Sequence, residues 1–208
     1  MDTKKTINIF MINGINSLLG WNAVLASLDY FQKQFAGYNI YSFLPIPLFL
    51  GYLITGFSYH ILSNRFKYIT LITIGNTITT CALIFMLLSS LLLDQTDIGY
   101  GLLLFAALLN GLGSNASQLT FYAMINYLSQ DVVSKFTVGT ALSGMFITGI
   151  RAIILAIAGA GNESIYPIII YFVLAILFNT FDLFLNRHFC TSPVYYEKID
   201  LFLLHHDQ

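Results

Sequence analysis

Charged residues are scarce in this chain, and their scarcity decides the class of protein. Only 9% of its 208 residues are Asp, Glu, Lys or Arg, whereas 57% are hydrophobic and the mean hydropathy is +0.74. Soluble domains carry about 25% charged residues, so a soluble fold of this length would lack the polar surface to cover itself. The net charge of −1 also excludes a basic nucleic-acid-binding protein. The sequence therefore predicts an integral membrane protein.

Cysteines and catalytic motifs are equally scarce. The two cysteines, Cys81 and Cys190, cannot form a disulfide framework and have no metal-ligand spacing. The chain contains no G-x-S-x-G nucleophile elbow, no H-E-x-x-H zinc pair and no glycine loop of the kind that cradles phosphate. We therefore expect no catalytic residue, no metal site, no cofactor and no enzymatic activity.

Long apolar stretches, in contrast, occur six times. Each is long enough for one membrane crossing, which takes about 20 residues as a helix. They cover residues 7–28, 41–62, 68–93, 98–128, 136–160 and 165–186. The first is longer than a signal-peptide core, so we expect no cleaved leader. The predicted fold class is all-α, a polytopic bundle of six transmembrane helices over residues 7–189, with a cytoplasmic N-terminus (1–6) and a cytoplasmic tail (190–208).

The basic residues predict the orientation of this bundle. With a cytoplasmic N-terminus, Lys33 is the one basic residue of the outer loops and Arg151 lies within a span. The remaining seven then face the cytoplasm, in agreement with the positive-inside rule: Lys4, Lys5, Arg65, Lys67, Lys135, Arg187 and Lys198. Both termini are therefore expected on the cytoplasmic side, with the plasma membrane favoured over an organelle.

A polar stripe crosses the fourth span. Asn110, Ser114, Ser117 and Gln118 share one helix face, because residues three, four, seven and eight apart line up. Hydrocarbon solvates no amide, so this face must turn inward. Two interpretations stay open: the side chains bind neighbouring helices, as Ser and Asn commonly do in membranes, or they line a substrate path.

Two further spans carry candidate functional residues. In the first, Asn13, Ser17, Trp21 and Leu25 recur every four residues, and Gly20 permits bending or a close backbone approach. Trp21 lies about 21 Å into this helix, too deep for an interfacial anchor, so it either packs in the core or lines a path.

The fifth span has a seam of small residues that lets helix backbones touch: Thr140, Gly144, Thr148, Ala152 and Ala156. Arg151 is expected to project into the bundle from nearly the same face. An arginine within a span is by default a functional candidate, the alternative being a structural partner such as an Asn side chain. Asp182, in the last span, is expected near Arg187 and the cytoplasmic surface.

Several of these residues together resemble the equilibrative nucleoside transporters. Leu18-Leu-Gly-Trp-Asn22 resembles the signature of that family's first helix, with Gly20 in place of the usual proline. Gln118 is similar to the family's fourth-helix glutamine, and its spacing to Gly139 and Gly144 matches the glycine-rich fifth helix. The stretch around Arg151 and the pair Tyr195-Tyr196 also resemble family features, so the likeness covers roughly residues 7–198.

The resemblance implies a major-facilitator-like N-terminal half and a set of site residues. Trp21, Asn22, Leu25 and Gln118 would line a nucleoside pocket, and Ser114 would tune substrate preference. Gly139 and Gly144 would pack the fifth helix against its neighbours. A base offers flat faces to an indole, and its edge suits a glutamine that both donates and accepts hydrogen bonds.

The same resemblance implies what would be missing. Family members have eleven spans, and the charged pair that grips the ribose belongs to the second half. The chain is therefore expected to supply the N-terminal bundle for facilitative, alternating-access transport of nucleosides or nucleobases, with a C-terminal half or a second copy as partner. Two alternatives stay open: a structural or regulatory membrane subunit, and half of another small-solute carrier or channel.

Overall fold

A computed structural model describes residues 3–93, 96–158 and 166–195, and every regular element in these ranges is a helix. The long helices are α1 (Thr3–Ser17), α5 (Pro45–Arg65), α6 (Tyr68–Leu92), α7 (Asp97–Ile125), α8 (Gln130–Ala158) and α9 (Tyr166–Cys190). The short helices are α2 (Leu19–Ala26), α3 (Leu28–Gln34), α4 (Ile40–Phe43) and α10 (Pro193–Tyr195).

The predicted six spans are confirmed. Six helical stretches of the described part are long and apolar enough to cross a membrane: Lys5–Ala26, Ile40–Arg65, Tyr68–Leu92, Asp97–Ile125, Gln130–Ile157 and Ile168–Cys190. The chain is thus an all-α, multi-pass membrane protein. The first span comprises α1 and α2, and the second comprises α4 and α5.

Helix boundaries follow local chemistry. Pro45 and Pro47 lie in the first turn of α5, where a missing backbone N–H costs nothing, so the prolines start this helix. Thr96 caps α7 by accepting a hydrogen bond from the backbone N–H of Gly99 at 3.0 Å. The first span is interrupted at Leu18 and ends before Ser27. At these two residues ψ is 5° and 1°, whereas an α-helix has ψ of about −42°.

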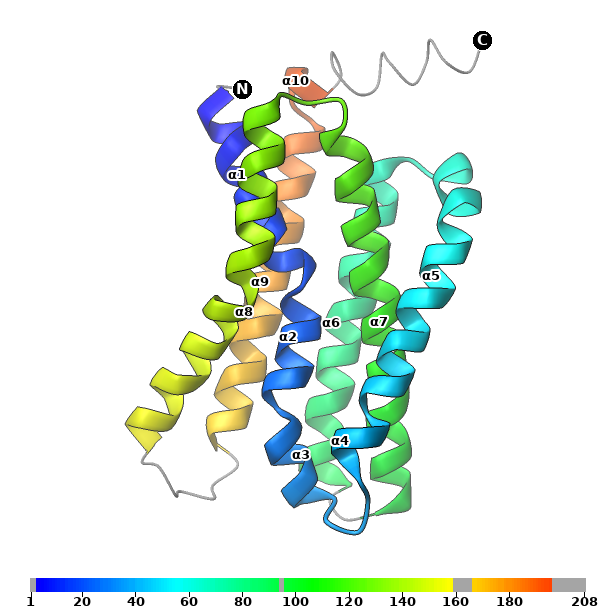
Figure 1. Ribbon diagram of the computed structural model, residues 1–208, viewed down its shortest axis with the longest axis vertical. Helices are drawn as coiled ribbons and strands as arrows, with labels where there is room; N and C mark the ends of the chain where they lie inside the picture. Colours follow the sequence, from blue (N-terminus) through cyan, green and yellow to red (C-terminus); the bar gives the residue numbers. More distant parts are fainter. Residues whose placement is uncertain (1–2, 94–95, 159–165, 196–208) are drawn as a thin grey trace.

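Both described chain ends lie at one end of the bundle (Figure 1), which we call the terminal end; the opposite end is the far end. The first span runs from the terminal end to the far end, and α7 runs the opposite way (Figure 1). Near the far end, α8 leans away from the rest of the bundle (Figure 1).

The six spans form two groups of three. α7 packs against both α5 and α6, whereas α8 and α9 pack against the first span. Contacts of α6 with α9 and of α2 with α7 join the two groups. Suppose that the first, second and third spans are matched with the fourth, fifth and sixth, respectively. The crossing of α1 with α8 then corresponds to the crossing of α7 with α5. Because α1 and α7 run in opposite directions, the two groups are inverted relative to one another.

Pairs of glycines make both crossings possible. A Cβ on Gly14 would lie 3.1 Å from the Cα of Gly139, and a Cβ on Gly111 would lie 3.1 Å from the Cα of Gly51. Each of these four glycines would also bring a Cβ into contact with a carbonyl oxygen of the facing helix. Only hydrogen fits in these places, so the equivalent crossings of the two groups depend on the same device.

A polar layer divides the hydrophobic core. Towards the terminal end, one cluster gathers around Phe10, Ile72, Phe121 and Phe189. Towards the far end, a larger cluster gathers around Leu19, Met86, Ala107 and Phe172. Between them lie buried polar side chains, which we call the polar layer: Asn13, Asn16, Ser17, Asn76, Asn110, Ser114, Ser117, Asn179, Asp182 and Asn186.

Candidate functional site

Asp182 lies at the centre of the polar layer and is fully buried. Its Oδ2 accepts three hydrogen bonds from asparagine side chains, each through Nδ2. The donors are Asn16 at 2.7 Å, Asn186 at 3.0 Å and Asn76 at 3.1 Å. These donors come from α1, α9 and α6, so one carboxyl group joins three membrane-spanning helices.

A second ring of hydrogen bonds holds these asparagines in place. Asn179 accepts a bond from Asn16 at 2.9 Å and donates to the carbonyl oxygen of Asn76 and to Thr80 Oγ1, both at 2.8 Å. Ser117 of α7 donates to Asn76 Oδ1 at 2.8 Å, which brings the fourth span into the network. The side-chain oxygen of Asn16 is buried and has no hydrogen-bond partner among the described residues.

The burial of Asp182 corrects the expectation that it lies near the surface beside Arg187. Arg187 is exposed, whereas Asp182 faces α1 and α6. A signal was present in the sequence, because Asn179, Asp182 and Asn186 are three and seven residues apart and share one helix face. The matching pair on the first span is Asn13 and Asn16, also three residues apart.

The predicted binding residue Trp21 faces α5. Its ring packs edge-on against Phe49, with ring centroids 4.6 Å apart, and against Tyr52 at 5.2 Å. Gly20, one residue earlier, faces α7, because a Cβ there would strike the side chains of Asn110 and Ser114. Of the two roles predicted for Gly20, bending or a close backbone approach, the structure shows the close approach, which places the segment of Trp21 beside the fourth span.

Asn22 and Leu25 face other neighbours. The Asn22 amide donates to Ser143 Oγ of α8 at 3.1 Å and is half-buried. Leu25 is 37% exposed, on the surface of the described bundle. Trp21 thus points towards α5 and Asn22 towards α8. These two helices lie on opposite sides of α2 in Figure 1.

The polar stripe of α7 divides into bonded and unbonded members. Asn110 donates to the carbonyl oxygen of Gly20 at 2.8 Å, Ser114 donates to Asn110, and Ser117 bonds Asn76. Asn110 and Ser117 thus connect α7 to other helices, whereas Ser114 bonds within α7. Gln118 is half-buried and makes no hydrogen bond to any residue that the structure describes.

The two glycines of the fifth span differ in their surroundings. Gly139 is buried against the backbone of α1, at the crossing with Gly14. Gly144 is partly exposed, and a Cβ there would meet only the Asn22 amide at ordinary contact distance, 3.8 Å. The buried face of α8 consists of Val132, Phe136, Gly139, Ser143 and Ile147, next to the predicted seam of small residues.

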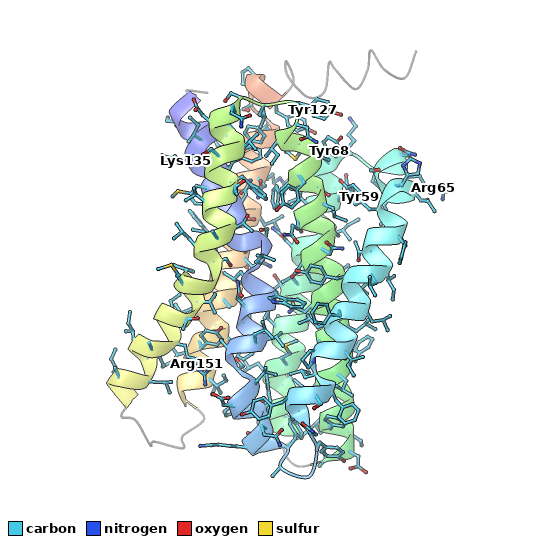
Figure 2. The ribbon with its side chains drawn as sticks, in the orientation of Figure 1. Tyr59, Arg65, Tyr68, Tyr127, Lys135 and Arg151 are labelled. Atoms are coloured by element: carbon cyan, nitrogen blue, oxygen red, sulfur yellow. The ribbon has the colours of Figure 1, made fainter. Side chains whose placement is uncertain are left out.

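Arg151 forms an ion pair instead of projecting into the polar layer. Its Nη2 lies 3.2 Å from Asp29 Oδ2, and 29% of its side chain is exposed. Figure 2 shows Arg151 far from Lys135, towards the far end. The Tyr41 hydroxyl also donates to Asp29, at 2.9 Å. This bond, with a smaller contribution from Arg151, holds the pKa of Asp29 below its usual value.

A cavity of about 290 Å³ lies apart from the polar layer and from the predicted binding residues. It is lined by apolar side chains of α2, α8 and α9, among them Leu19, Phe146 and Tyr171. None of the predicted binding residues lines it. Leu177 and Phe181 of its lining are exposed, which gives the cavity the character of a lipid-facing groove.

Within the described residues, no group of three His, Cys, Asp or Glu side chains is placed to hold a metal ion. No protein-family model matches the chain, and a comparison with curated proteins finds no match either.

Proposed function

We propose that this chain is one helical bundle of a carrier for nucleosides or nucleobases, and that substrate passes between it and a second bundle. Trp21, Asn22, Leu25 and Gln118 would contact the substrate, with Ser114 behind them. The choice of substrate rests on the resemblance of the first, fourth and fifth spans to equilibrative nucleoside transporters.

The observation that carries the proposal is the unbonded amide of Gln118. It lies seven residues, about 10 Å, inside the span from Ile125. It is half-exposed on the surface of the described bundle. An unmet amide in hydrocarbon costs several kcal/mol, so this part of the surface suits a second protein surface or a wet path better than lipid.

The inverted arrangement of the two three-helix groups supports the same proposal. Inverted repeats of three helices are a recurrent architecture within the halves of secondary transporters. In such carriers, substrate binds near the membrane midplane between bundles that rock against each other. The partner bundle would be a C-terminal half or a second copy of this chain.

The proposal includes an orientation. With the terminal end in the cytoplasm, Arg65 and Lys135, both at this end in Figure 2, satisfy the positive-inside rule. The plasma membrane is the proposed location, since extracellular nucleosides are the substrate that a facilitative carrier of this kind would take up.

Uptake of radiolabelled uridine and adenosine tests the proposal. Cells expressing the chain, alone and with a second bundle, should take up label above the level of cells with empty vector. Gln118→Ala should weaken nucleoside binding and so lower this uptake, whereas the matched control Gln130→Ala, at an exposed position, should leave it unchanged. Surface labelling must show equal amounts of each variant in the membrane.

The proposal would be overturned if uptake never exceeds background, whether the chain is expressed alone or with a second bundle. In that case the polar stripe of α7 serves helix association alone, as Asn110 and Ser117 already do, and the protein is a structural subunit.

A further inference from the structure

Asp182 is a buried carboxyl group that the proposed substrate path does not use. It lies eight residues, about 12 Å, inside the span from Cys190. A carboxylate taken out of water needs a compensating positive charge or a proton. The ion pair formed by described residues, Arg151 with Asp29, lies elsewhere in the bundle.

No positive side chain that the structure describes on the surrounding helices fills this need. α1, α2, α6 and α8 pack against α9. The titratable side chains that the structure describes on these four helices and on α9 form no hydrogen bond or ion pair with Asp182. They are Lys5, Tyr68, Cys81, Asp131, Lys135, Arg151, Tyr171, Arg187, His188 and Cys190. The groups that do face Asp182 are uncharged asparagine amides.

The two carboxyl oxygens of Asp182 have different surroundings. Three N–H groups already point at Oδ2. The other oxygen, Oδ1, faces the amide of Asn13, and the nearer amide atom lies 2.8 Å away. Because an amide carries an oxygen on one side and an NH₂ group on the other, its orientation decides what Oδ1 meets.

In one orientation, Asn13 pairs reciprocally with Asn186. Asn13 donates to Asn186 Oδ1 at 2.8 Å and accepts from Asn186 Nδ2 at 3.2 Å. The Asn13 oxygen then faces Asp182 Oδ1 at 2.8 Å. This is the length of an O–H···O hydrogen bond, so the contact is favourable when a proton on Asp182 Oδ1 is donated to Asn13.

In the other orientation, the Asn13 NH₂ group donates to Asp182 Oδ1 at 2.8 Å and to the carbonyl oxygen of Ile9 at 3.1 Å. This arrangement suits an ionised carboxylate, which only accepts hydrogen bonds. The reciprocal pair with Asn186 is then lost, because like atoms of the two amides face each other. The same side chain thus serves both protonation states of Asp182.

We propose that Asp182 is a proton-binding site, and that the Asn13 amide turns over as the proton binds and leaves. On release, the proton goes from Asp182 Oδ1 to water, and the Asn13 NH₂ group replaces the O–H as the donor between the two residues. The turn exchanges hydrogen bonds between α1 and α9, and α1 continues into the proposed substrate-binding segment, α2. Resting on the proposed function, this makes the carrier proton-coupled.

A sodium ion fits the same place less well. The three N–H groups at Oδ2 would repel a metal ion, and Asp182 Oδ1 is already at hydrogen-bonding distance from the Asn13 amide. Sodium dependence is therefore an outcome that would overturn the proposal.

Infrared spectroscopy of the purified protein tests proton binding without any transport. In protein labelled with ¹³C-aspartate, the carbonyl stretch of a protonated carboxyl group should be present at low pH and disappear as the pH rises. Asp182→Asn should remove this band, and Asp131→Asn, at an exposed position, should keep it. Asp182→Glu removes the labelled band while preserving a carboxyl group, which covers the case in which Asp182→Asn does not fold.

Absence of an Asp182-dependent band, or a band unchanged over the whole accessible pH range, would overturn the proposal. So would a band that responds to sodium at constant pH. A titrating band in a protein that takes up no nucleoside leaves the proton site standing and refutes the proposed function instead.

Uptake into proteoliposomes tests the coupling. With an acidic exterior, wild-type protein should accumulate nucleoside, up to about tenfold for each pH unit of gradient if one proton accompanies each substrate. Asp182→Asn should equilibrate nucleoside without accumulation, and Asp131→Asn should behave as wild type. Nucleoside uptake that is indifferent to the gradient in wild-type protein would overturn the coupling while leaving the proposed carrier function intact.

Discussion

Gly14 and Gly139 face each other where α1 crosses α8, with the Cα of Gly139 3.1 Å from the place that a Cβ on Gly14 would occupy. The same relationship recurs between Gly51 and Gly111 where α5 crosses α7. These contacts position the segments that hold Trp21 and Gln118, so the glycines determine the geometry of the proposed site from a distance.

Gly139→Ala should destabilise the protein by about 1–3 kcal/mol, because the new methyl group would meet the backbone of α1 and force the helices apart. Thermal unfolding in detergent would show this as a lower melting temperature. The matched control on the same helix is Gly149→Ala, where nothing lies within 4 Å of the new Cβ. Equal stability of the two variants would contradict the close crossing.

The inverted relationship predicts a matching effect in the other group. Gly111→Ala should destabilise by a similar amount, since a Cβ there would strike the carbonyl oxygen of Leu48. Gly101→Ala, also on α7 but with nothing within 4 Å, is its control and should be neutral or slightly stabilising. A large loss for Gly139→Ala together with none for Gly111→Ala would show that the two crossings are not equivalent.

Asn179→Leu should lower stability by at least about 1–3 kcal/mol. The substitution removes one of the two acceptors of the Asn16 amide. It also removes the hydrogen bonds that Asn179 donates to the carbonyl oxygen of Asn76 and to Thr80. Unfolding monitored by circular dichroism in denaturant would measure the loss. Asn64→Leu, on the exposed surface of α5, provides the comparison and should change stability by far less.

The pKa of Asp29 should rise in Tyr41→Phe, because the Tyr41 hydrogen bond is the largest cause of its lowering. Arg151→Gln should raise this pKa as well, because it removes both a hydrogen bond and a positive charge from Asp29. Since the folded-state pKa lies below the unfolded value of about 3.9, the contribution to stability is present above that pH and disappears as the pH falls through the folded-state pKa. The Asp29 side chain is 63% exposed and that of Arg151 29%, so solvent screens the pair and this contribution should stay within about 1 kcal/mol.

NMR titration of ¹³C-labelled aspartate in both variants would measure these shifts, with Tyr122→Phe as the control. A pKa of Asp29 that does not rise in Tyr41→Phe would contradict the assignment of the Tyr41 hydrogen bond as its main cause.

The membrane class, the six spans and the inward-facing stripe of α7 could all be predicted from the sequence. Each depends on composition or on periodicity within one helix, which a single stretch of chain displays. The threonines of α6 illustrate this: threonine hydroxyls can bond back to their own helix, and Thr73, Thr77 and Thr80 each donate to the carbonyl oxygen four residues earlier.

The partners of the buried polar groups could not be predicted. Asn16 and Asp182 are separated by 166 residues, and Arg151 and Asp29 by 122. Helical periodicity shows which side chains share a face but not which faces meet, because the meeting depends on how all six helices pack. For the same reason Asp182 was expected near the surface, although its own face carries two asparagines.

The central claim is that nucleoside occupies the space next to Gln118, and protection of an introduced cysteine tests it most directly. In a Cys81→Ser background, which removes the exposed native cysteine, Gln118→Cys should react with a thiol reagent more slowly when uridine or adenosine is present. Gln130→Cys should react at one rate with and without nucleoside. If nucleoside leaves the rate at Gln118→Cys unchanged, in the presence of a second bundle as well as without it, the assignment of this site to nucleoside binding is wrong.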